Sequence, residues 1–174
     1  MKQLEDYVRS IPNFPEEGIT FRDVTTVIGD SDAFHKAIDC MEESLKDTEF
    51  DVIVAAESRG FIFGSPIAYN TRTSLVLARK KGKLPCETIA EEYALEYGTA
   101  TLEMHKDAIK KGQKVVIIDD LLATGGTVQA IIKLVERLGG EVVKICCLIE
   151  LPELNGRKAL EGYDVESVMT FDGE

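Results

Sequence analysis

The stretch VVIIDDLLATGGT at residues 115–127 decides the fold of this chain. An apolar, β-branched run ends at two adjacent carboxylates, Asp119 and Asp120, and small, hydroxyl and glycine residues follow before a helical pattern begins. This order predicts a buried strand, a tight loop and the N-terminus of a helix. The first N–H groups of a helix lack partners within the helix, and its dipole favours negative charge there, so the loop is a candidate anion site.

The two acids beside this loop would repel a bare phosphate, so Asp119 and Asp120 should face another group. Sugar hydroxyls, or a sugar phosphate chelated to a metal ion, fit that arrangement best. The plainer alternative is a strand, a turn and a helix in which Asp120 or Thr127 acts only as a cap. The stretch matches neither the P-loop pattern nor the GxGxxG pattern of a dinucleotide site.

The segments around this stretch predict an α/β fold. Apolar residues recur at helical spacing over 128–138, Gly139 and Gly140 would end that helix, and 142–148 is typical of another buried strand. Other helices are expected at 31–45, 61–69 and 154–160. Other strands are expected at 51–56, 74–78, 102–109 and 165–171, with a long excursion or hairpin over 80–100. We therefore expect a mainly parallel central sheet flanked by helices, with ligands at the carboxyl ends of its strands.

The composition narrows the classes of partner. The chain has 174 residues, which suits one domain with an adequate core, and its net charge is −11. An acidic protein is a poor binder of nucleic acid or of anionic membranes, which select basic surfaces. No apolar run approaches the length of a membrane span, the N-terminus lacks the features of a secretory signal, and the four cysteines show no metal-ligand spacing. We expect a cytoplasmic protein with reduced thiols.

The stretch 115–127 resembles the signature of the type I phosphoribosyltransferases, which bind phosphoribosyl pyrophosphate (PRPP). Segments that resemble the adenine-specific members of this family are IPNFPEEGITFRDVT (11–25), ESRGFIFG (57–64), RKKGKLP (79–85) and ALEYGTATLEMHKDAI (94–109). The resemblance implies one phosphoribosyltransferase domain over 1–174, with an N-terminal base-binding hood over 1–30 and a flexible catalytic loop over 80–100.

The resemblance also implies a reaction, the transfer of the 5-phosphoribosyl group from PRPP to adenine with release of AMP and pyrophosphate. Asp119 and Asp120 would approach the ribose 2′- and 3′-hydroxyls. Mg²⁺ would be held mainly by substrate oxygens and water, without a fixed protein cage. The 5′-phosphate would bind the backbone N–H groups of Ala123, Thr124, Gly125, Gly126 and Thr127. The hydroxyls of the two threonines would be additional donors.

Pyrophosphate is assigned to the basic residues that follow two predicted strands. Ser58 and Arg59 come directly after one strand, and the planar guanidinium of Arg59 suits charge-assisted hydrogen bonds to pyrophosphate. The alternative for Arg59 is a surface ion pair or a cap. Arg79 and Lys80 follow the next strand and would add contacts, some of them across the interface of a homodimer. The resemblance further implies a strained, cis-type peptide bond before Ser58, and we assign no role to Glu57.

The loop over 80–100 carries the proposed catalytic acid, Glu96, and its neighbour Tyr97. In the resembled family this loop closes over the reaction centre and excludes water that could hydrolyse the reactive sugar. Glu96 would accept the adenine N9 proton or stabilise it electrostatically, and the alternative is a solvent-facing acid. We interpret three other acids of this region as solvent-facing: Glu91, Glu92 and Glu103.

Base selection is assigned by the resemblance to Thr20, Phe21 and Arg22 of the hood. Phe21 would supply a stacking surface, while backbone groups near the other two would recognise the edge of the base. A site built around hydrogen bonds rejects a base that leaves its polar groups unpaired. Asp23 would be structural, through a pair with Arg22 or as a cap for the threonines that follow it.

Two alternatives to adenine transfer stay open. A closely related enzyme would use xanthine, hypoxanthine or guanine. A regulator would keep the PRPP site without catalysis, but it would normally need an added DNA-binding segment. The first fifty residues offer one amphipathic helix and no basic recognition surface, so the regulator is the weaker alternative.

Overall fold

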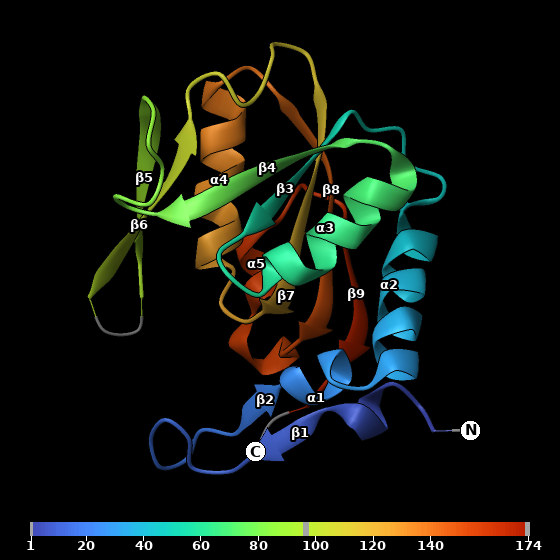
Figure 1. The fold of residues 1–174 in the computed structure, drawn as a ribbon. Helices are drawn as coiled ribbons and strands as arrows, with labels where there is room; N and C mark the ends of the chain where they lie inside the picture. The colour runs from blue at the N-terminus through green and yellow to red at the C-terminus, as the bar shows by residue number, and fades with distance from the viewer. Residues whose placement is uncertain (1, 96–97, 173–174) are drawn as a thin grey trace.

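The computed structural model describes residues 2–95 and 98–172, and its centre is a seven-stranded sheet (Figure 1). The strand order is β5-β6-β4-β3-β7-β8-β9, and neighbouring strands from β4 to β9 pair in parallel. β5 and β6 form an antiparallel hairpin on the edge next to β4. The strands are β3 (Val52–Ala56), β4 (Ser74–Lys80), β5 (Thr88–Ala94), β6 (Thr99–His105), β7 (Lys114–Leu122), β8 (Glu141–Glu150) and β9 (Val165–Thr170).

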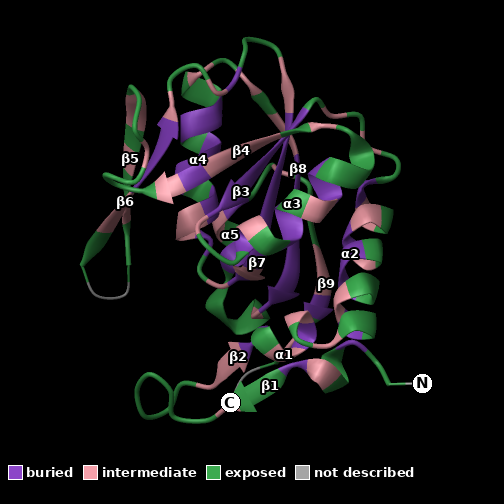
Figure 2. Cartoon of the chain, in the orientation of Figure 1, coloured by how far each residue is buried: buried purple, intermediate pink, exposed green. Residues whose placement is uncertain are grey.

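Helices cover both faces of this sheet. One core contains side chains from α2 (Ser31–Leu45) and α3 (Gly60–Thr71), and the opposite core contains those of α4 (Gly126–Arg137). β7 sends Val116 and Ile118 into the first core and Val115 and Ile117 into the second. A strand that is buried on both faces needs no polar alternation, which explains the continuous apolar run in the sequence (Figure 2).

The N-terminal segment packs at the carboxyl end of the parallel strands (Figure 1). It contains a two-stranded antiparallel sheet, and Leu4, Val8, Val24 and Val27 join the core that includes α2. The elements of this segment are η1 (Glu5–Tyr7), β1 (Arg9–Ile11), β2 (Phe21–Asp23) and α1 (Thr25–Ile28). Two short helices lie between β8 and β9, namely η2 (Pro152–Leu154) and α5 (Gly156–Ala159).

The expected mainly parallel sheet with flanking helices is confirmed, with differences at the element ends. Asp30 is the N-cap of α2, since its side chain accepts from the N–H groups of Asp32 and Ala33. The excursion over 80–100 is part of a hairpin whose strands run to His105. α4 begins at Gly126, two residues before the apolar periodicity starts at Val128, and Gly125 is its N-cap. No helix within 2–95 and 98–172 has the length and apolar character of a membrane span.

Candidate active site

The carboxyl ends of β3 and β7 bring together two segments that lie about sixty residues apart in the sequence. Ala55 pairs with Ile118, so the turn after β3 meets the acids at the end of β7. The Arg59 Nε donates to Asp120 Oδ2. A Cβ atom placed on Gly60 would lie 3.1 Å from both Asp119 Oδ1 and the Ile118 carbonyl oxygen, so a glycine favours this close approach.

Asp119 and Asp120, the acid pair, are almost fully buried, with exposed fractions of 7% and 6%. Burial raises the pKa of the Asp119 carboxyl well above its ordinary value, and the charge of Asp120 raises it further. Burial alone would lower the pKa of Arg59, but the hydrogen bond to Asp120 keeps it raised. The Arg59 guanidinium compensates part of the negative charge of the acid pair. This arrangement reduces the repulsion that the acids would exert on a nearby phosphate.

The loop of residues 123–127, the phosphate loop, has the backbone shape of an anion site. Gly125 adopts a left-handed conformation with φ +86°, and α4 begins at the next residue. In the described part of the chain, no N–H group of this loop donates to a carbonyl through a turn or cap. The loop lines a hollow of about 80 Å³ together with Tyr93, Ala94 and Leu95 of the hairpin. A small anionic group can bind there at the N-terminus of α4.

The Ser58 side of the site is tied to the end of β4 by Glu57. The Glu57 Oε2 atom accepts from the Lys80 N–H at 2.6 Å and lies 3.4 Å from the Arg79 Nε. The Glu57–Ser58 peptide bond is cis, as the family resemblance implied. Arg59 follows β3, whereas Arg79 and Lys80 are the last two residues of β4, which extends two residues beyond the expected strand. The three basic residues lie at one edge of the sheet and form a basic surface suited to pyrophosphate.

The hood reaches the same edge through Phe21. The Arg59 guanidinium lies over the Phe21 ring, 5.8 Å from its centroid, and Phe14 packs edge-on against Phe21 at 5.4 Å. The Arg22 side chain lies elsewhere: its Nη1 donates to Ser10 Oγ at 2.5 Å. The Arg22 guanidinium also stacks on the ring of Phe171, near the C-terminus. Arg22 and Thr20 both line a hollow of about 170 Å³.

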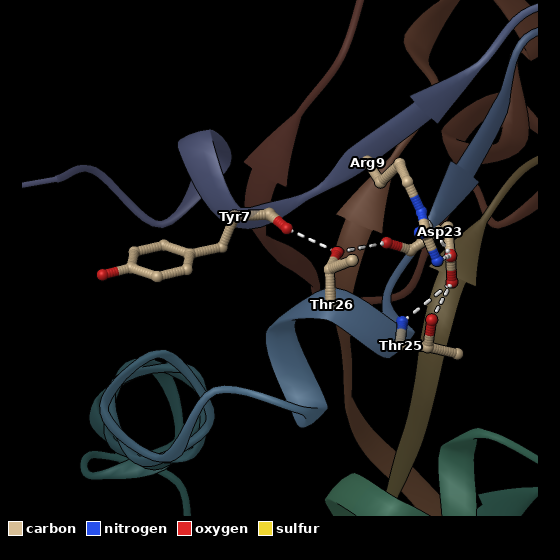
Figure 3. A network of polar contacts seen from close by, with 5 residues as sticks. All are labelled: Tyr7, Arg9, Asp23, Thr25 and Thr26. Carbon is tan, nitrogen blue, oxygen red and sulfur yellow. Dashed lines mark hydrogen bonds and ion pairs between the residues drawn. The ribbon is translucent and has the colours of Figure 1, made fainter.

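Asp23 holds the hood together (Figure 3). Its Oδ2 accepts from Arg9 Nη2 at 2.6 Å, and its Oδ1 accepts from the Thr25 N–H and hydroxyl at 2.9 and 2.6 Å. The hydrogen bond from the Thr25 side chain, followed by that from Arg9, lowers the pKa of Asp23 to about 2. Thr26 adds a bond from its hydroxyl to the Tyr7 carbonyl at 2.5 Å.

A family comparison adds to this geometry. The phosphoribosyl transferase domain family matches residues 26–170. The chain is 66% identical to an adenine phosphoribosyltransferase of Lachnoclostridium phytofermentans over the full length of both, and 62% identical to that of Agathobacter rectalis over the same extent. The chain belongs to the adenine phosphoribosyltransferase family.

Solved structures of this family have the same fold. The adenine phosphoribosyltransferase of Thermoanaerobacter pseudethanolicus superposes with a TM-score of 0.94 at 52% identity, covering 97% of this chain and all of that one. The Saccharomyces cerevisiae enzyme, solved with adenine and an imino-altritol bisphosphate, gives 0.89 at 38% identity, covering 95% of this chain and 96% of that one. The agreement extends over almost the whole of each chain.

Three acids of this family member differ from their sequence interpretation. Glu57 had no assigned role, yet it joins the ends of β3 and β4. Glu103 is buried rather than solvent-facing and accepts from the Gly82 N–H at 3.0 Å. Glu91 pairs with Lys133 and Arg137 of α4 at 3.0 and 3.3 Å. The partners of these acids lie 21 to 46 residues away in the sequence, on paired strands or on α4, so local patterns did not indicate them.

The prediction that Asp23 pairs with Arg22 is wrong. Asp23 lies opposite Arg9 in the antiparallel β1–β2 pair, whereas Arg22 lies opposite Ser10 and points to the other face of that small sheet. The prediction that Asp23 caps the following threonines is confirmed for Thr25, whose N–H group and hydroxyl donate to the Asp23 carboxylate. The Thr26 hydroxyl donates instead to the Asp23 backbone carbonyl, at 3.1 Å. Glu96 and Tyr97 lie outside the described residues.

No protein metal cage is evident within residues 2–95 and 98–172, where no three His, Cys, Asp or Glu side chains cluster around a common point. The acid pair is the nearest candidate donor set. Asp120 is engaged by Arg59, and Asp119 Oδ1 accepts from the Asp120 N–H at 2.8 Å. These residues fit a cation only if substrate oxygens and water complete its coordination.

Proposed function

We propose that this protein acts at the carboxyl edge of its sheet, where it transfers the 5-phosphoribosyl group of PRPP to adenine. The products are AMP and pyrophosphate, and the protein is a glycosyltransferase of purine salvage. One observation carries this assignment: Arg59 contacts both the acid pair and the aromatic hood residue Phe21. The acid pair, which we assign to the sugar, and the Phe21 ring, which we assign to the base, therefore both lie next to one guanidinium.

The reaction needs positioning and charge stabilisation more than covalent chemistry. The bond from C1′ to the pyrophosphate oxygen breaks, the bond from C1′ to adenine N9 forms, and the N9 proton leaves. In our proposal Asp119 and Asp120 accept from the ribose hydroxyls and favour the positive charge that develops on C1′. Their burial supports this role, because charge interactions are stronger where water is excluded.

Each end of PRPP has its own group of residues in this proposal. The 5′-phosphate binds the N–H groups of the phosphate loop and the hydroxyls of Thr124 and Thr127. The free N–H groups of that loop support this assignment. Pyrophosphate binds Ser58 and Arg59. Because the Arg59 guanidinium already donates to Asp120, pyrophosphate and Asp120 compete for it. The remaining pyrophosphate contacts come from Arg79 and Lys80 at the end of β4.

The base site and the catalytic loop complete the proposed domain of residues 1–174. Within the hood (1–30), Phe21 stacks on adenine while backbone groups of Thr20 and Arg22 recognise its edge. The loop over 80–100 supplies Glu96, which receives or stabilises the N9 proton, and Tyr97, which lines the same side. The hairpin supports this role, because Tyr93 to Leu95 line the hollow beside the phosphate loop.

Mg²⁺ enters this proposal as a companion of PRPP. When bound, the ion neutralises part of the pyrophosphate charge and makes it a better leaving group. The acid pair can contribute to its surroundings through ribose hydroxyls and water. Substrate oxygens supply most of its ligands, in keeping with the reluctance of Mg²⁺ to lose its water shell.

We also propose a cytoplasmic homodimer. The outer side of α3 exposes two large side chains among its polar residues, with exposed fractions of 38% for Ile62 and 84% for Tyr69. A second copy of the chain would cover these two side chains. The Arg79 guanidinium of β4 lies over the ring of Phe61 in α3, 6.0 Å from its centroid. A partner subunit on α3 would therefore lie close to the residues that we assign to pyrophosphate.

One experiment tests the function. The protein is supplied with PRPP and Mg²⁺ and with adenine, hypoxanthine, guanine or xanthine in turn, and nucleotide and pyrophosphate are measured. We expect turnover with adenine and little with the 6-oxopurines, since their oxo group accepts where the adenine amino group donates. Turnover of a 6-oxopurine but not adenine would instead support the related purine enzyme. PRPP binding without turnover of any base would support a regulator.

A further inference from the structure

The phosphate loop rests on a second segment, which no feature of the reaction explains. A Cβ atom on Gly156 would lie 2.4 Å from the Ala123 carbonyl oxygen and 2.9 Å from the Leu122 Cδ1. In return, a Cβ atom on Gly125 would lie 3.0 Å from the Gly156 carbonyl oxygen. The two backbones are therefore in direct contact, and no side chain fits between them. The conformation of the phosphate loop depends on where the backbone of Gly156 lies.

The segment of residues 155–159, the support segment, is also tied to the helix that follows the loop. The Gln129 Nε2, in the first turns of α4, donates to the Ala159 carbonyl at 2.6 Å. The Gln129 N–H itself donates to the Gly125 carbonyl at 2.9 Å, which makes it the first bond of that helix. One residue thus holds the loop on one side and the support segment on the other.

An ion pair between a buried acid, Glu150, and the half-exposed Arg157 fixes the support segment to the sheet. Glu150, at the end of β8, is only 4% exposed, and both of its carboxylate oxygens accept from Arg157 at 2.7 and 2.8 Å. The Arg157 Nη1 also donates to the Val165 carbonyl of β9 at 2.7 Å. Bidentate pairs of this kind set an orientation as well as a distance. Arg157 therefore determines where its neighbour Gly156 meets the loop.

We propose that Gly156, Gln129 and the Glu150–Arg157 pair are positioning residues for the 5′-phosphate site. They hold the backbone of residues 123–125 so that its N–H groups converge on one anion. This inference rests on the proposed function. The ligands that it concerns are those with a sugar 5′-phosphate, such as PRPP and AMP, and not pyrophosphate, which binds at the ends of β3 and β4.

The test is Gly156→Ala, with Gln129→Ala as a second variant because residue 129 is near the surface and its loss should not prevent folding. In both variants we expect KM for PRPP and the inhibition constant of ribose 5-phosphate to rise together. The rise should be about tenfold for Gly156→Ala, equivalent to one lost charge-assisted hydrogen bond, and smaller for Gln129→Ala. The inhibition constant of inorganic pyrophosphate and KM for adenine should stay unchanged.

Gly140→Ala is the matched control for Gly156→Ala. A Cβ atom there would lie 2.7 Å from the Ile109 Cγ2 and 2.9 Å from the Val135 Cγ1, at the opposite end of α4. This control should lose stability through overpacking without a change in KM for PRPP. Equal losses of ribose 5-phosphate and pyrophosphate affinity, or wild-type affinities in both variants, would overturn the inference. A wild-type protein without adenine turnover would instead refute the proposed function.

Discussion

Asp23 in the hood and Asp119 at the end of β7 are both 7% exposed, yet their carboxyl groups are shifted in opposite directions. Arg9 and Thr25 surround Asp23 with donors, which lowers its pKa to about 2. Asp119 accepts from one backbone N–H and lies beside a second acid, and burial raises its pKa. Equal burial therefore has opposite consequences, depending on how many donors face the carboxylate.

This difference separates a structural acid, Asp23, from Asp119, the acid that we propose to be functional. Asp23 is satisfied by its neighbours, so its charge stabilises the folded hood. Asp119 accepts from the Asp120 N–H, and we propose that ribose hydroxyls add donors to this buried carboxyl group. Perturbed carboxyl groups of the second kind are concentrated at functional sites.

The largest expected effect is on activity. Replacing both acids of the acid pair, in Asp119→Asn with Asp120→Asn, should lower kcat/KM on the order of 10²–10³-fold, because the developing positive charge on C1′ loses its stabilisation. Initial rates with adenine and PRPP measure the loss, and thermal unfolding checks that the fold is kept. Wild-type kinetics in the double variant would mean that the acid pair has no role in the reaction.

The next effect concerns the hood. Asp23→Asn removes the charge that Arg9 and Thr25 face, a loss of about 2 kcal/mol for charge-assisted hydrogen bonds. At pH 7 we expect a fall in Tm of roughly 4–8 °C for a chain of this size. Asp39→Asn, an exposed acid on α2, is the control and should leave Tm nearly unchanged. A Tm that is the same in both variants would show that Asp23 does not hold the hood.

The acid dependence of stability follows from the same residue. The pKa of Asp23 is about 2 in the folded protein, below its ordinary 3.8, so the folded state binds the proton less readily than the unfolded state. Its stabilisation is therefore complete above the ordinary value and is lost as the pH falls toward 2. Urea unfolding of the wild type and of Asp23→Asn at several pH values measures this. We expect the difference in free energy of unfolding between the two proteins to disappear as the pH falls from the ordinary value of 3.8 toward 2. A difference that stays constant would contradict the stabilising role of the Asp23 charge.

The sequence predicts the acid pair better than it predicts the hood, for a physical reason. The strand, loop and helix over 114–138 are contiguous, so apolar periodicity and glycines describe them locally. The approach of Arg59 to Asp120 also follows, because the carboxyl ends of parallel strands share one edge.

The contacts of Asp23 and Glu57 depend on which strands pair and in what register. β1 and β2 are three residues each, too short for a pattern that would place Arg9 opposite Asp23. Glu57 meets Lys80 only because β3 and β4 are neighbours with a particular alignment. Such partners are set by tertiary packing, which single-sequence patterns do not encode.

The smallest expected effect has the opposite sign to that in the hood. Asp119→Asn keeps an oxygen for the Asp120 N–H but removes a poorly solvated acid, so Tm at pH 7 should rise by roughly 2–4 °C while activity falls. Since the pKa of Asp119 is raised by folding, its ionisation destabilises the folded state as the pH increases above the ordinary value. The gain should therefore be largest at neutral pH and disappear in acid. A fall in Tm at pH 7 would mean that the Asp119 carboxylate stabilises the fold as Asp23 does, and the distinction between the two acids would fail.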